Sequence, residues 1–218
     1  MPRNSTATSK KSASSSSSRS SSGGSSKSSS GGSRSKSSSS RSNAKTAPYN
    51  EETKLKELFV EELRDIYWAE KHMTKSLPKM SKAATSPELA EAFQTHLAET
   101  EEQISRLEEV FGMLEMPARA KKCEAMEGLA REAQTAIEDT DKGTSTRDAA
   151  LIISAQKAEH YEIASYGSLV QLAKTMGLNE VAETLQQTLE EEKKTDVMLT
   201  ELAVSSVNIN AGSESEEE

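Results

Sequence analysis

LAEAFQTHLAETEEQISRLEEVF, residues 89–111, repeats its apolar side chains in alternating steps of three and four residues. This spacing is typical of an α-helix that buries one face along the seam of a helical bundle. Ser86 is a suitable N-cap for this helix, and Pro117 ends it. His96 lies on the buried stripe, and Glu99 follows three residues later, so both side chains share one face of the helix. The stretch therefore predicts a bundle helix that carries potential metal ligands.

Three further long segments have the same helical period. They span about residues 51–84, 145–177 and 179–203, and a shorter helix is expected at about residues 123–139. Aromatic residues make up only 4% of the chain and runs of β-branched residues are few, so no strand is predicted. Tight turns join the first two and the last two long helices, whereas the middle connection is long enough to cross the bundle. The predicted fold class is all-α: a ferritin-like four-helix bundle of two antiparallel hairpins with an additional short crossover helix.

Local signals predict the helix ends. Pro78 is expected to kink or tighten the last turns of the first helix, because it lacks a backbone N–H. Ser145 and Asp148 have capping-box spacing at the start of the third long helix, and Gly177 suits its end. Asn179 is expected to cap the last helix.

Each of the other long helices also carries glutamate on or beside its apolar stripe. An unpaired charge buried at such a position has a large desolvation cost. The turn of the first hairpin places Glu70 level with Glu99, and the turn of the second brings Glu159 and Glu162 close to the height of Glu192. Carboxylates that meet inside a bundle call for a compensating cation, so the sequence predicts a carboxylate-bridged metal pair.

The predicted metal site comprises one histidine and five glutamates, namely Glu70, His96, Glu99, Glu159, Glu162 and Glu192. Carboxylate and imidazole ligands with open positions suit dinuclear iron, or manganese, better than calcium or zinc. Diiron carboxylate proteins usually have the order Glu-x-x-His on such a helix. Here the second helix reads His-x-x-Glu, and the last helix has no histidine. The predicted site is therefore richer in carboxylate than the usual pattern.

Neighbouring residues leave alternatives open. Glu62 lies more centrally on the first stripe than Glu70 but two turns away from the matched height, so Glu70 is preferred and Glu62 is its competitor. His160 is either a second nitrogen ligand or a partner that orients a ligand carboxylate. Asp196 also lies on the last stripe, and its role stays open. Tyr166 could hydrogen-bond a ligand carboxylate, although plain core packing is the favoured interpretation.

Cys123 is the only cysteine of the chain, which excludes an internal disulfide and fits a reducing, cytoplasmic compartment. It follows two lysines near a predicted helix N-terminus, a setting that makes thiols reactive. Packing as a small side chain beneath the crossover is nevertheless the favoured interpretation.

The two ends of the chain differ from the helical part in composition. Residues 1–48 are mainly serine, with nine basic and no acidic residues, and are predicted to be a disordered tail. Residues 49–208 are predicted to form the ferritin-like domain, and residues 209–218 a disordered acidic tail. Beyond residue 48, the remaining 18 of 27 basic residues stand against all 35 acidic ones, a net charge of −17.

The basic tail is expected either to bind nucleic acid through its phosphates or to act only as a solubilising segment. No stretch approaches the roughly 20 apolar residues of a membrane span, and the N-terminus has no apolar core of a secretory signal. The sequence therefore predicts a protein without a membrane partner.

Five stretches resemble the YciE/YciF family of stress-associated ferritin-like proteins: ELRDIYWAEKHMTKSLPKM, LAEAFQTHLAETEEQISRLEEVF, KKCEAMEGL, DAALIISAQKAEHYEIASYGSL and TLEEEKKTD. They cover nearly all of residues 54–204 in the family's order. The resemblance implies a rubrerythrin-like bundle with an extra crossover helix, a homodimer, and metal ligands at the six positions named above. It implies no settled reaction, and the serine-rich tail lies outside it.

The leading functional hypothesis is a dimeric stress-response protein whose metal pair oxidises Fe(II) with O₂ or peroxide, as a ferroxidase- or peroxidase-like oxidoreductase. One alternative is a non-catalytic helical dimer whose basic tail binds nucleic acid. Another is iron storage, which requires a closed shell of many subunits.

Overall fold

The computed structural model describes residues 53–215, which form helices and connecting turns with no strand among them. The long helices are α1 (Lys54–Ala83), α2 (Pro87–Met113), α4 (Ser145–Thr175) and α5 (Asn179–Leu202), and the shorter helix is α3 (Glu124–Asp139). A π-helical turn, η1 (Ala203–Val207), and the short helix α6 (Asn208–Ala211) follow α5. The predicted all-α fold is confirmed, whereas the predicted tail of residues 1–48 lies outside the described residues.

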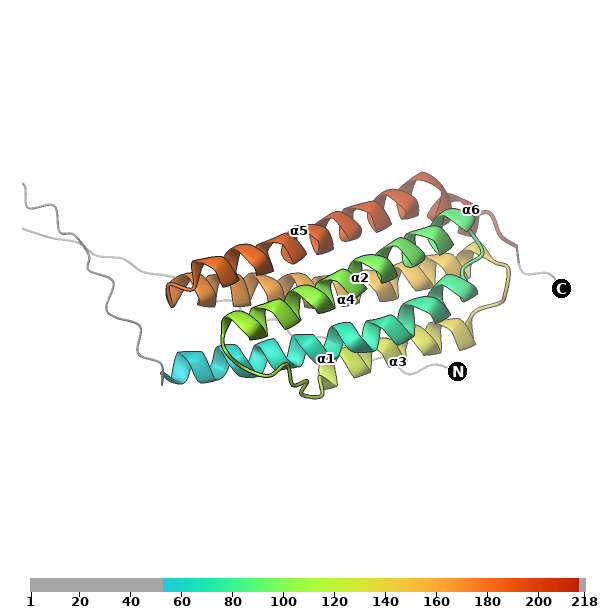
Figure 1. Ribbon diagram of the computed structural model, residues 1–218. Helices are drawn as coiled ribbons and strands as arrows, with labels where there is room; N and C mark the ends of the chain where they lie inside the picture. Colours follow the sequence, from blue (N-terminus) through green and yellow to red (C-terminus); the bar gives the residue numbers. More distant parts are fainter. Residues whose placement is uncertain (1–52, 216–218) are drawn as a thin grey trace, which may run out of the picture. The chain divides into compact units, whose positions relative to one another are not determined.

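The four long helices are arranged as two antiparallel hairpins, α1 with α2 and α4 with α5 (Figure 1). The hairpins close into a bundle because α2 also packs against α5 and α1 against α4. α3 lies outside this bundle, along α1 and α4. The connection through α3 returns the chain along the bundle, so α2 and α4 run in the same direction (Figure 1). This is the predicted crossover topology.

The interior of the bundle is mostly apolar towards its ends, apart from Arg147 and Asp148 at the start of α4, and polar in the middle. Along α1, the buried side chains are apolar from Phe59 to Ala69 and again from Met73 to Met80, with Glu70 between them. The other three long helices also place buried polar side chains near their middle, including His96, Glu159, Glu162 and Glu192. The fold thus carries a layer of ionisable groups inside an otherwise apolar core.

The helix ends follow the predicted positions, but some of the capping contacts differ. α1 continues as a helix through Pro78, whose ring is exposed. Thr144, not Ser145, caps α4 by accepting a hydrogen bond from the backbone N–H of Arg147. Asp148 accepts hydrogen bonds from the turn before α2 instead of from its own helix. Gly177 has a φ of 75°, as expected for the residue that ends a helix.

The C-terminal end of the helical domain lies beyond the predicted boundary at residue 208, since α6 continues to Ala211. Glu214 then folds back onto the start of α4. Its Oε1 accepts from the backbone N–H of Ser145 at 2.5 Å and its Oε2 from that of Thr146 at 3.0 Å. A carboxylate at a helix N-terminus is favourable because the first N–H groups have no partner within the helix.

Candidate metal centre

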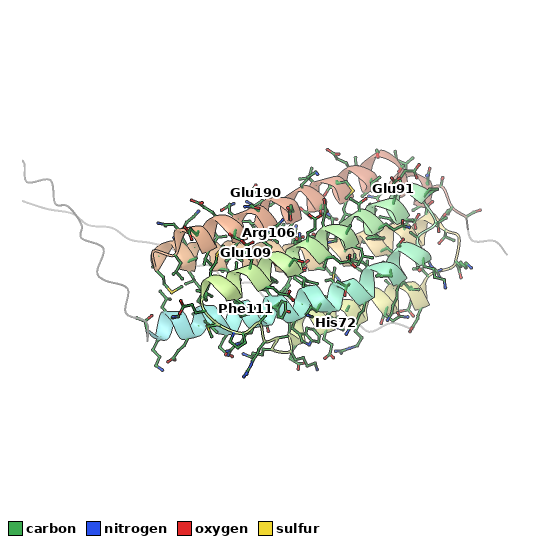
Figure 2. All side chains as sticks on the ribbon, in the orientation of Figure 1. His72, Glu91, Arg106, Glu109, Phe111 and Glu190 are labelled. Carbon is green, nitrogen blue, oxygen red and sulfur yellow. The ribbon has the colours of Figure 1, made fainter. Side chains whose placement is uncertain are left out.

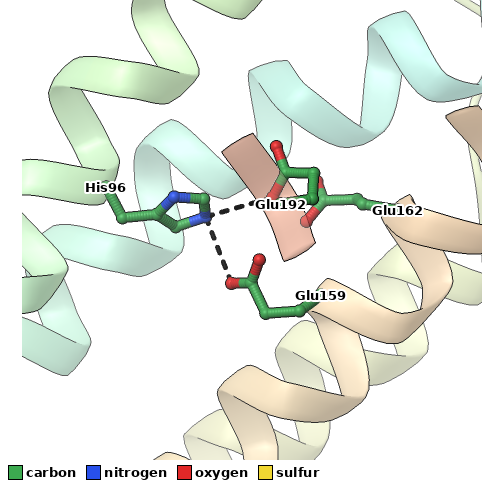
Figure 3. A group of neighbouring side chains, drawn as sticks. All are labelled: His96, Glu159, Glu162 and Glu192. Carbon is green, nitrogen blue, oxygen red and sulfur yellow. Dashed lines mark ion pairs between the residues drawn. The ribbon is translucent and has the colours of Figure 1, made fainter. Parts of the chain in front are cut away.

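Four of the six predicted ligands meet inside the bundle (Figure 3). His96 comes from α2, Glu159 and Glu162 from successive turns of α4, and Glu192 from α5. Each offers one ligand atom, and these atoms all lie within 4.8 Å of one another. All four side chains are buried. The helical period explains why these four side chains lie together, because each of them occupies a core-facing position that would otherwise hold an apolar residue.

The imidazole of His96 contacts more carboxylates of this site than any other side chain in the group. Its Nε2 lies 3.2 Å from Oε1 of Glu159 and 3.9 Å from Oε2 of Glu192, as the dashed lines in Figure 3 mark. Its Nδ1, on the other side of the ring, lies 3.7 Å from Oε2 of Glu99. One side chain from α2 therefore faces carboxylates from α4 and α5 and from its own helix.

Glu70 lies beside the group of four but is not one of it. It is fully buried on α1, and its Oε1 accepts a hydrogen bond of 2.5 Å from the hydroxyl of Tyr166. Its competitor Glu62 is exposed. Glu99, the remaining predicted ligand, has a side chain that is 29% exposed and lies at the edge of the centre. The six predicted residues thus divide into a buried group of four, a buried neighbour and a half-exposed neighbour.

The interior of the bundle disfavours the charged form of the carboxyl groups of Glu70, Glu162 and Glu192. Burial raises the pKa of Glu70 to about 7, although the hydrogen bond from Tyr166 lowers it. Burial, and next the negative charges of neighbouring glutamates, raise the pKa of Glu162 and that of Glu192 well above the usual range. Without a cation, the site favours protonated carboxyl groups.

The charge on His96 depends on opposing effects. Burial by itself lowers the pKa of this imidazole, but the carboxylates of Glu159, Glu99 and Glu192 outweigh it and raise the pKa well above its ordinary value. The same contact with His96 lowers the pKa of Glu99. A protonated imidazole is thus the cation that the chain itself supplies, and it balances one carboxylate at most.

The residues fit a bound cation, because most of the buried polar atoms that lack a partner belong to them. Among the described residues, seven buried side-chain atoms have no hydrogen-bond partner, and five of these come from predicted ligands: Oε2 of Glu70, Nδ1 of His96, and Oε2 of Glu159, Glu162 and Glu192. Buried polar atoms are normally satisfied, and each that is not has a free-energy cost. Four carboxylates and an imidazole are ligands that iron and manganese accept.

A hydrogen-bond network that the sequence did not predict supports the centre from α2. Gln103 donates from Nε2 to Oε1 of Glu192 at 2.5 Å and to Oε2 of Glu191 at 3.2 Å. Arg106 then binds Glu191 through both of its terminal nitrogens and donates to the hydroxyl of Thr188. The only signal for Gln103 is its position seven residues after His96, two turns along the same face.

Tyr166 belongs to the centre through its hydrogen bond to Glu70, which is the interpretation that the sequence favoured less. His160 is exposed, and its Nε2 lies 3.2 Å from Oδ1 of Asp196, which also accepts from Gln156. His160 and Asp196 are therefore not among the atoms that meet in the interior. Cys123 is buried, and burial raises its pKa, which supports packing over a reactive thiol.

Residues 54–212 match the family described as "Domain of unknown function (DUF892)". The chain is 47% identical over 158 residues to Protein YciF of Escherichia coli strain K12, covering 72% of this chain and 95% of that protein. The chain belongs to the YciE/YciF family. It is therefore a homologue of YciF, with a buried His/Glu group that could hold a metal ion.

Three solved structures have the same fold. The crystal structure of the E. coli stress protein YciF matches with a TM-score of 0.69 and 46% identity, over 72% of this chain and 99% of that one. A putative structural protein from Rhodopseudomonas palustris matches with a TM-score of 0.65 and 41% identity, over 68% and 94%. A protein from Xanthomonas campestris pv. campestris matches with a TM-score of 0.55 and 25% identity, over 71% and 94%. In the part of the chain that is described, no helix is long and apolar enough to cross a membrane.

Proposed function

We propose that this protein is a stress-response metalloprotein whose interior binds two iron or manganese ions and oxidises Fe(II) with O₂ or peroxide. The observation that carries the proposal is the set of four buried carboxylate oxygens without a hydrogen-bond partner, Oε2 of Glu70, Glu159, Glu162 and Glu192. Charge supports two ions, because the carboxylates of Glu70, Glu159, Glu162 and Glu192, when ionised, balance two divalent cations. An empty site would instead keep protons on carboxyl groups whose pKa values burial has raised.

Hydrogen bonds from the chain hold two of the proposed ligands in place. Tyr166 donates to Oε1 of Glu70 and Gln103 to Oε1 of Glu192, so in each case the bond fixes one oxygen and leaves Oε2 without a hydrogen bond. Such bonds orient a carboxylate before the cation arrives. Tyr166 and Gln103 are therefore positioning residues for the centre.

Bound iron would supply redox chemistry between Fe(II) and Fe(III), which the carboxylates and the imidazole that would hold it cannot supply. With Fe(II) as the substrate, two ions lose one electron each, and one hydrogen peroxide takes both electrons and two protons to give two waters. Buried carboxyl groups release protons when they bind a cation, so the site itself can supply protons for this reaction.

Metal analysis combined with an oxidation assay tests this proposal. Protein purified without chelator should contain up to two equivalents of iron or manganese per chain, and loaded Fe(II) should be oxidised by peroxide faster than Fe(II) in buffer. Glu70→Gln should lose much of this activity. Glu62→Gln, the same change at an exposed position of α1, should not. A wild-type protein that neither binds nor oxidises iron would overturn the proposal.

A second candidate function is that of a non-catalytic helical dimer that binds nucleic acid. The nine basic residues and absence of acidic residues in 1–48 favour it, as does the description of the R. palustris relative as a putative structural protein. Phosphate binding by basic side chains releases counterions, so the binding constant should fall by about 10³-fold or more between 50 and 200 mM salt if six or more phosphates are contacted.

Deletion of residues 1–48 should abolish this binding, as measured by fluorescence anisotropy with a labelled duplex. A full-length variant with the nine basic residues replaced by glutamine separates charge from length. Equal binding by all three proteins would contradict the role of the tail. Native mass spectrometry of the same samples distinguishes a dimer from the closed shell that iron storage would need.

A further inference from the structure

A pocket of about 300 Å³ lies between α2 and α5, on the side of the bundle where these helices meet. Its polar lining includes Glu88, Glu91, Thr95, Glu99, Lys194 and Thr195. Figure 2 labels Glu91 in the first part of α2, where this helix runs beside α5. Two larger grooves, one between α1 and α3 and one between α3 and α4, are lined by none of the six predicted ligands. The α2–α5 pocket therefore differs from both, since Glu99 forms part of its wall.

Glu99 and His96 together connect this pocket with the buried centre. The Glu99 side chain is 29% exposed, and its Oε2 lies 3.7 Å from Nδ1 of His96. That nitrogen is buried and has no hydrogen-bond partner. The other nitrogen of the ring lies 3.2 Å from Glu159 inside the centre. One imidazole thus has one edge on the pocket side and the other edge on the four-residue group.

The charges around the pocket favour a cation. Three carboxylates line it, those of Glu88, Glu91 and Glu99, against the single positive charge of Lys194. Lys194 lies close enough to Glu99 to stabilise its ionised form. A cluster of like charges at the mouth of a narrow site attracts ions of opposite sign and raises their rate of association.

We propose that the α2–α5 pocket is the entry site through which a hydrated divalent cation reaches the centre, and that Glu99 is a transit ligand instead of a resident one. This inference rests on the proposed function, because it requires that the centre binds metal. It accounts for the half-exposed position of Glu99, which a resident ligand would not need. It also gives Lys194 a role, since its positive charge opposes entry and limits the rate.

Rates of cobalt(II) uptake by metal-free protein test the inference. Co²⁺ does not oxidise readily in air, and its binding can be followed by stopped-flow quenching of Trp68, the single tryptophan of the chain. Glu99→Gln should slow uptake about tenfold while the number of ions bound at equilibrium stays that of the wild type. Glu101→Gln makes the same charge change at an exposed position of α2 outside the pocket and should leave the rate unchanged. Lys194→Gln should accelerate uptake at low ionic strength.

The outcomes separate this inference from the proposed function. Absence of Co²⁺ binding by the wild type would overturn both. Normal binding with equal uptake rates for Glu99→Gln and Glu101→Gln would overturn only the entry site. Loss of one bound ion per chain in Glu99→Gln would show that Glu99 is a resident ligand and would also overturn it.

Discussion

Glu192→Gln should bind divalent metal at least about 100-fold more weakly than the wild type, while its metal-free form should resist unfolding better. The loss of affinity follows from the removal of a buried carboxylate whose Oε2 has no hydrogen-bond partner. The gain in stability follows because Glu192 is fully buried among other carboxylates. At pH 8 the metal-free wild type must either bury its charge or hold a proton above the usual pKa of a carboxyl group, and a neutral amide avoids both costs. The amide oxygen can still accept the hydrogen bond from Gln103. We expect a rise of about 1–3 kcal/mol in the free energy of unfolding at pH 8.

Isothermal titration with Mn²⁺ and urea unfolding in the presence of chelator measure the two effects. Glu190→Gln is a matched control, because Glu190 lies two residues away on α5 and is exposed. Glu190→Gln should change neither the affinity for Mn²⁺ nor the free energy of unfolding by a comparable amount. A Glu192→Gln protein that keeps its metal affinity would contradict a metal role for this carboxylate, and a metal-free form that is less stable than the wild type would contradict the cost assigned to its burial.

The fold was predictable because each long helix repeats its apolar residues at one period over many turns. The stripe from Leu89 to Val110 is almost entirely buried, as its spacing predicts. The crossover followed from the lengths of the connections, which allow close packing within each hairpin but not between α2 and α4. Capping was less predictable, since Asp148 has a suitable spacing for its own helix yet binds the turn before α2. A local pattern does not reveal which tertiary partner competes for a side chain.

The position and burial of the centre were predictable from the heights of glutamates along the hairpins and from the apolar stripes on which they lie, whereas the partial exposure of Glu99 was not. The match of heights correctly separated buried Glu70 from exposed Glu62. It also placed Glu99 beside the same centre. Glu99 precedes Thr100, which lies on the buried stripe of α2, so its side chain points to the edge of the stripe and stays partly exposed. The sequence also gives no means to distinguish a buried glutamine such as Gln103 from a packing residue, because its role depends on the carboxylate that faces it across the bundle.

Metal-free protein should lose stability as the pH rises from 5 to 8, by about 3 kcal/mol from Glu70 alone. The pKa of Glu70 is raised from 4.5 to about 7 in the folded protein, so the folded state holds this proton more tightly than the unfolded state. Its stabilising effect is complete below pH 4.5 and is lost as the pH rises to about 7. The raised pKa values of Glu162 and Glu192 extend the loss to higher pH.

His96 acts in the same direction, because its folded pKa is also raised and its contribution is lost as the pH rises through that value. Partly exposed carboxyl groups with lowered pKa values, such as Glu61 and Glu127, act oppositely, but only as the pH falls towards 4.5 and below. Between pH 5 and 8 the partial burial of His72, which lowers its pKa, acts oppositely, but this is one partly buried group against several fully buried groups of the centre. Urea unfolding with chelator at pH 5, 6, 7 and 8 measures the loss, and Glu70→Gln should reduce it. A chelated wild type that gains stability over this range would contradict the assignment.

Bound metal should reverse this pH dependence. A divalent cation binds the ionised carboxylates, so its affinity rises as the groups lose their protons, and its binding free energy adds to the stability of the folded state. With saturating Mn²⁺, stability should therefore rise from pH 5 to pH 7, where the chelated protein becomes less stable. The two curves should meet near the acidic end, because protonated carboxyl groups need no cation. The buried glutamates of this bundle should thus destabilise the protein without metal at neutral pH and stabilise it with metal, which would couple folding to metal supply.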